Sequence, residues 1–204
     1  MGLQLITPAV GLPLSVDQAK AQSRITAIDA SQDELISLNI QTATRYAERR
    51  LSRQLLTATY KYVMDDFPSG YDERFNPHAI ELPLAPVQSI TRIEYIGDDG
   101  SLVEWDSSLW TADLISEPAR IRPIYQGFWP VYQQTLNAVQ ITFVAGYGNA
   151  ASVPPEIKTS ILMLAAHLYE NRETTTDVEL LEVPYAVRDQ LDLYRWHPNS
   201  FAVI

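Results

Sequence analysis

The chain has 204 residues, of which 46% are hydrophobic and 20% are charged, and its formal net charge at pH 7 is -10. This composition excludes a disordered or fibrous protein, because so much apolar surface can form a real core. The absence of cysteine excludes disulfides, thiolate metal sites and cysteine nucleophiles.

The first region, residues 1–54, is predicted to be helical. Its apolar start follows no basic residue and therefore resembles no signal peptide, so we expect synthesis in the cytoplasm. Ser15 and Gln18 have the spacing of a capping box, which predicts a helix from there to about Ile28. Ser31–Glu34 repeats this spacing. It is followed by apolar residues at steps of three and four, which predict one long amphipathic helix: Ile36, Ile40, Ala43, Ala47 and Leu51.

Four arginines gather where this long helix ends: Arg45, Arg49, Arg50 and Arg53. Cations in the last turns of a helix favour the negative end of the helix dipole, which is one explanation of the cluster. The other is an interface with a partner rich in carboxylates or phosphates, since the rest of the chain is acidic. We therefore treat the cluster as a candidate contact with a neighbouring subunit or with DNA.

The second region, residues 55–150, changes to the alternating pattern of short strands. It carries five basic and twelve acidic side chains, and is the most acidic part of the chain. Gly97–Gly100 is typical of a hairpin turn. We expect an inserted, small antiparallel β subdomain with these strands: Leu56–Tyr62, Ile80–Leu84, Ser89–Ile96, Leu102–Trp105, Trp110–Ile115, Ala119–Ile124 and Ala138–Val144.

Aromatic residues are concentrated in this β region: Trp105, Trp110, Tyr125, Phe128, Trp129 and Tyr132. Most should form its core, because a small sheet has few other large side chains. The segment Tyr125–Tyr132 lies between two expected strands, and exposed aromatics in loops mark contact surfaces. A carbohydrate-binding module is therefore one alternative function.

The third region, residues 151–204, returns to helical periodicity. Pro154 and Pro155 suit a first helical turn, and the apolar face that follows should pack against the long helix of the first region. Its longest apolar stretch, Ile161–Ala166, is far too short to span a membrane. A last short helix is expected over Pro184–Trp196, before the apolar tail Phe201–Ile204. The predicted class is α+β, an antiparallel bundle of about four helices with the β subdomain inserted.

Residue types that carry chemistry form no convincing catalytic, metal or cofactor site. His78, His167 and His197 do not have the spacing of zinc ligands. The acidic pairs Asp65–Asp66 and Asp98–Asp99 fit turns, where Asp bonds to its own backbone. The alternative is a glycosidase of a phage particle, which needs two carboxylates at one cleft; its candidates are Asp65, Asp66 and Glu104.

Several segments, in this order, resemble the head–tail connector (adaptor) family of tailed bacteriophages and gene transfer agents. They lie in both helical regions: Leu14–Lys20, Asp33–Ile36, Glu48–Arg53, Val153–Lys158 and Ala166–Glu173. The resemblance implies a structural virion protein without catalytic residues, cofactor or membrane contact. It also implies a ring of twelve copies beneath the portal, which extends the channel for double-stranded DNA without reading its sequence.

The same resemblance implies further partners and a location. The ring would provide the platform for a neck stopper or tail-completion protein at the head–tail interface of the virion, after assembly in the host cytoplasm. The C-terminal tail is the expected portal contact, with the anchors Trp196, Phe201, Val203 and Ile204. A different neck or tail-completion protein is the nearest alternative.

Overall fold

The computed structural model describes residues 1–25, 30–70, 78–171 and 184–195. They form two compact units, which we describe separately. Among the described residues, the sheet unit comprises Met1–Ala9 and Thr57–Tyr147, and the helical unit comprises Val10–Leu56 and residues 148–171 and 184–195. The expected regions had their boundaries at residues 54 and 150, and the expected helical region included residues 1–9, which instead belong to the sheet unit.

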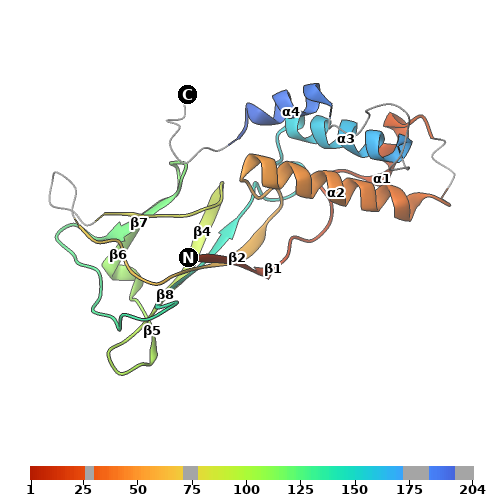
Figure 1. Ribbon diagram of the computed structural model, residues 1–204. Coiled ribbons are helices and arrows are strands. Elements are labelled where there is room, and N and C mark those ends of the chain that lie inside the picture. Colours follow the sequence, from red (N-terminus) through yellow and green to blue (C-terminus); the bar gives the residue numbers. More distant parts are fainter. Residues whose placement is uncertain (26–29, 71–77, 172–183, 196–204) are drawn as a thin grey trace. The chain divides into compact units, whose positions relative to one another are not determined.

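The helical unit contains four helices in its described residues: α1 (Val16–Gln22), α2 (Asp33–Leu51), α3 (Pro155–Glu170) and α4 (Tyr185–Asp192). As expected, α2 and α3 run side by side, and α4 packs against both (Figure 1). Ile40 on α2 and Ile157 and Ile161 on α3 are almost fully buried. The periodicity of the two apolar faces thus identified the centre of the bundle.

The helix beginnings agree only in part with the expected capping boxes. At α1 the box is present: the Gln18 backbone N–H donates to the Ser15 hydroxyl at 3.2 Å, and the Ser15 N–H donates to the Gln18 side chain at 2.9 Å. This helix ends at Gln22 and not near Ile28. The second box is wrong, because α2 begins after Gln32, which makes no side-chain cap. Asp33 in the first turn of α2 instead pairs with the buried ammonium group of Lys20.

The sheet unit contains two antiparallel sheets (Figure 1). The five-stranded sheet has the order β1-β2-β8-β4-β5, and the three-stranded sheet has the order β3-β7-β6. The strands are β1 (Gly2–Thr7), β2 (Ala58–Met64), β3 (Ile80–Glu81), β4 (Val87–Ile96), β5 (Leu102–Glu104), β6 (Trp110–Asp113), β7 (Arg120–Pro123) and β8 (Val139–Ala145), with a short 3-10 turn at Ser107–Leu109. Seven of them match the expected set in order. Neither β1 nor the division into two sheets was predicted from the sequence.

Buried residues from both sheets form one hydrophobic core. Phe143 and Ile141 of β8, Ile93 of β4 and Ile121 of β7 are all 0% exposed. An aromatic cluster extends this core: the Phe67 ring stacks on Trp129 with centroids 4.8 Å apart and meets the Tyr132 ring edge-on at 5.2 Å. Most of the aromatic residues therefore serve the core, as expected.

No helix within the described parts of the chain is long and apolar enough to cross a membrane.

Ile40 and Leu38 on α2 provide a matched test of the bundle core, since Ile40 is 0% and Leu38 is 56% exposed. Replacing Ile40 by Ala leaves a cavity between α2 and α3 and should lower the free energy of unfolding by about 2–5 kcal/mol. The same change at Leu38 should cost less than about 0.5 kcal/mol. Denaturant unfolding of both variants measures this, and similar losses would contradict the assignment of the buried face.

Candidate functional site

The last two turns of α2 place Arg45 and Arg49 on one face, because residues four apart lie above one another on a helix. Together with neighbouring residues of α2 and with Arg195, which follows α4, they line a shallow groove of about 620 Å³ in the helical unit. Its wall is formed by these residues: Thr42, Arg45, Tyr46, Arg49, Arg50 and Arg195. We call this feature the arginine groove.

Two of the four predicted arginines attach α4 and the residues after it to α2. The Arg50 guanidinium donates to Asp192 Oδ2 at 2.6 Å. This bond raises the pKa of Arg50 and keeps the group charged. Arg53 Nε donates to the Tyr194 carbonyl oxygen at 2.7 Å. Both arginines therefore have a structural role within the chain.

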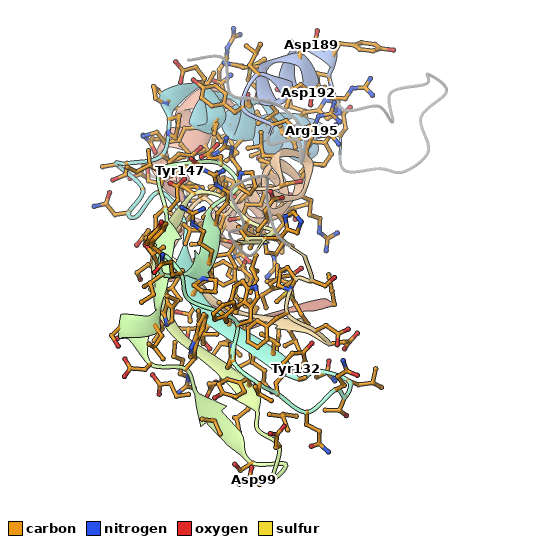
Figure 2. All side chains as sticks on the ribbon, turned by 90° about the vertical axis from the view of Figure 1, so that its left-hand side faces the viewer. Asp99, Tyr132, Tyr147, Asp189, Asp192 and Arg195 are labelled. Carbon is orange, nitrogen blue, oxygen red and sulfur yellow. The ribbon has the colours of Figure 1, made fainter. Side chains whose placement is uncertain are left out.

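The remaining cations of the groove face solvent. The side chains of Arg45, Arg49 and Arg195 are exposed, and none of the three has an ion-pair partner among the described residues. Arg195 lies close to Asp192 at the end of α4, as Figure 2 shows. Three guanidinium groups in one shallow groove form a surface that can bind carboxylates or phosphates.

Glu48 lies among these arginines but is directed into the unit. Its Oε1 accepts from the Leu55 backbone N–H at 3.1 Å and from Gln54 Nε2 at 2.9 Å. Burial raises the pKa of the Glu48 carboxyl, an effect that the Leu55 hydrogen bond and the charge of Arg45 only partly oppose. Ser52, in the left-handed conformation with φ of 54°, ends the helix here. Glu48 thus fixes the turn that leads out of α2.

Sequence reasoning found four arginines of this region but missed Arg195. No local pattern indicates it, because α4 brings it to the groove from the other end of the chain. The expected portal anchors, Trp196, Phe201, Val203 and Ile204, lie outside the described residues.

Of the three carboxylates considered for a glycosidase, two accept hydrogen bonds within the sheet unit and the third lies on a different strand. Asp65 Oδ1 accepts from the Asn137 backbone N–H at 2.9 Å, and Asp66 Oδ1 accepts from the Tyr132 hydroxyl at 3.3 Å. Glu104 is an exposed residue of the three-residue strand β5. Asp99 at the tip of its hairpin (Figure 2) accepts from Ser101, in keeping with turn chemistry.

Among the residues that the structure describes, neither possible metal ligands nor histidines form an alternative site. Within the described ranges, no group of three His, Asp or Glu residues is placed to hold a metal ion. Nδ1 of His167 lies 3.2 Å from the side-chain nitrogen of Asn171 at the end of α3. This placement fits a structural histidine better than a ligand or a base.

One protein family matches part of the chain. Residues 131–195 match the family described as phage gp6-like head-tail connector protein. No curated protein sequence matches the chain. The match covers α3, α4 and the end of the sheet unit, and agrees with the family resemblance found in the sequence.

Solved structures share the fold over nearly the whole chain. The "Neck of empty GTA particle computed with C6 symmetry" has a chain that is 21% identical, with a TM-score of 0.76, covering 96% of this chain and 95% of its own. With the same identity and coverage, the TM-score is 0.77 for the "Virion of native gene transfer agent (GTA) particle" and 0.68 for the "Neck of native GTA particle computed with C12 symmetry". These matches confirm the α+β connector fold and give no support to the glycosidase or glycan-binding alternatives.

Replacing Glu48 by Gln tests the electrostatic cost of this buried carboxyl, since the amide oxygen can accept the same two hydrogen bonds. The raised pKa means that the folded protein holds the Glu48 proton more tightly than the unfolded chain. The wild type should therefore lose stability relative to Glu48→Gln as pH rises from about 4.5 through the folded-state pKa. Above the folded-state pKa, the difference in unfolding free energy between the wild type and Glu48→Gln should stay constant. Denaturant unfolding of both proteins at a series of pH values measures this difference.

Glu34→Gln on the same helix controls for the loss of one negative charge, because Glu34 is exposed. If the stability curves of wild type and Glu48→Gln run parallel at all pH values, burial does not govern this carboxyl.

Proposed function

We propose that this chain is a head–tail connector, a structural protein of the neck of a phage or gene transfer agent particle. The observation that carries this conclusion is the fold similarity to chains of particle necks, which extends over 96% of the chain. The connector family matched by residues 131–195 supports the same role. A non-enzymatic role agrees with the structural use of Asp65, Asp66 and His167.

The chain works, in this proposal, as a ring of twelve copies beneath the portal. A ring is supported by the C6 and C12 symmetry of the matched neck structures. Its net charge of -10 suits a conduit, because an acidic wall repels the duplex and lets it pass without being held. The ring receives the neck stopper or tail-completion protein on its far side, and it assembles in the host cytoplasm.

The C-terminal tail supplies the portal contact in this proposal. Four side chains of this tail are apolar although the region before it is acidic, so they suit burial in a partner: Trp196, Phe201, Val203 and Ile204. The arginine groove supplies a second contact, either with carboxylates of the neighbouring copy or with DNA phosphates.

The function is tested in particles produced without the chain, with the full chain, or with residues 1–195 only. Without the chain, electron microscopy should show DNA-filled or empty heads that lack tails. Residues 1–195 keep the arginine groove intact and should fold as the full chain does, yet be missing from the particles and fail to pull down portal. Normal tailed particles without the chain would refute the connector role, and normal recovery of residues 1–195 would refute only the portal contact.

The arginine groove is tested by the double change Arg45→Glu and Arg49→Glu. Both side chains are exposed, so the free energy of unfolding should fall by no more than about 1 kcal/mol, mainly from the helix dipole. If the groove binds a neighbouring copy, the variant should be missing from particles. If it binds DNA, the variant should be incorporated while genome retention falls. Counting protein and DNA per particle separates these outcomes.

A matched control changes two exposed arginines outside the groove, Arg24 and Arg122, to Glu. It makes the same change in net charge and should leave incorporation and DNA content unchanged. Normal particles from both double variants would show that the groove takes no part in the assembly.

A further inference from the structure

The strand β1 forms an unprotected edge of the five-stranded sheet. It pairs with β2 on one side only, and it ends the strand order. All six of its residues are exposed, including Leu3 (42%), Leu5 (48%) and Ile6 (46%). Edge strands usually carry charges or prolines that prevent pairing with another chain. Gly2–Thr7 contains neither, so both its apolar side chains and its open backbone edge are available to a partner.

A second exposed apolar surface of the same unit is the segment Ile124–Asn137, which joins β7 to β8 and which we call the aromatic loop. Its exposed members are Ile124 (41%), Tyr125 (83%), Phe128 (70%), Val131 (76%) and Leu136 (77%). Residues 127–135 have neither helical nor strand structure. The backbone N–H groups of Gly127 and Gln133 donate within the unit and Pro130 has none, so a strand would pair with backbone groups of the other residues.

The aromatic loop is held in place from inside the unit. Trp129 stacks on Phe67, the Tyr132 hydroxyl donates to Asp66, and the Gln133 backbone N–H donates to the Ile96 carbonyl at 2.8 Å. The exposed side chains between these anchors are therefore presented on a fixed support. A surface ordered in advance loses less entropy when it binds.

Both surfaces are free of charged side chains in a strongly acidic protein. The first charged side chain of the sequence is Asp17, and none occurs between Pro123 and Pro155. Copies with a net charge of -10 repel one another, and this repulsion is weakest where two uncharged surfaces meet. The charge distribution therefore favours a second copy of this chain as the occupant of both surfaces.

Ring symmetry determines how the two surfaces combine. Pairing β1 with the β1 of another copy is a two-fold contact, which stops at a dimer, whereas a ring needs two different surfaces on each copy. We infer that β1 of one copy docks on the aromatic loop of the next copy, with its open edge along residues 127–135 and its leucines against the exposed aromatics. This inference rests on the ring of the proposed function.

The absence of native cysteine allows a direct test by cross-linking in particles. The double variant Leu5→Cys with Val131→Cys is treated with an oxidant or a short bismaleimide, which tolerates an imperfect register. A ladder of covalent multimers is expected from the double variant, and only monomers from each single variant. Leu5→Cys paired with Ile115→Cys is the matched control, because Ile115 is apolar and 95% exposed but lies outside both surfaces.

The outcomes separate this inference from the proposed function. Absence of the wild-type chain from the particles refutes the connector role. Its presence without a ladder from the double variant refutes the docking of β1 on the aromatic loop. Dimers from Leu5→Cys alone refute it as well, in favour of a two-fold contact.

A charge variant gives an independent measurement. Leu5→Asp places a carboxylate on the uncharged edge and should reduce incorporation into particles about tenfold, while Ile115→Asp should not. Thermal unfolding of the purified variants verifies that both remain folded. Equal incorporation of the two variants would overturn the inference.

Discussion

The pairing of β2 with β8 is the constraint on which the whole chain depends. The sequence leaves the helical unit after Leu56 and returns to it at Gly148, so a sheet of about ninety residues interrupts one helical bundle. Ala58 lies opposite Ala145 in the antiparallel register, which brings the exit and the return of the chain together. Gln88 strengthens this point, since its side chain donates to both Thr57 and Gly146. Because the two ends of the insertion lie side by side, α2 and α3 can pack as if a short loop joined them.

How much of this fold the sequence determines differs between elements. The faces of α2 and α3 were predictable, because burial against a partner helix imposes a repeat of three and four residues. The strand β1 was not predictable, because all of its residues are exposed and its partner β2 begins 51 residues after β1 ends. At the start of α2 the expected capping box of Ser31 is absent, and the ion pair of Asp33 with the buried Lys20 there is a contact between two helices that no local pattern reveals. Local sequence patterns therefore predicted the elements whose burial follows from their own periodicity, and they did not predict contacts between distant parts of the chain.

The same distinction applies to the arginine groove. The cluster could be predicted from the sequence, since four of the fifteen basic side chains lie within nine residues of an acidic chain. The different roles of its members could not be predicted. Arg50 and Arg53 bind α4 and Tyr194, whereas Arg45 and Arg49 remain exposed, and this depends on where α4 packs. A cluster of like charges is tolerable here because two of its members are paired inside the chain and Glu48 lies among the others.

The acidic character of the chain explains why contacts between copies should be confined to few surfaces. Twelve acidic side chains against five basic ones make the sheet region repulsive to its own copies, and β1 and the aromatic loop are two exposed apolar surfaces there without charged side chains. In the helical unit the arginine groove is a cationic surface, whose attraction for carboxylates is screened by salt. The proposed apolar contact is not weakened by charge screening. A ring held by both would keep its sheet contacts at high ionic strength and lose mainly the contacts of its helices, so in this proposal the two units would contribute to assembly in physically different ways.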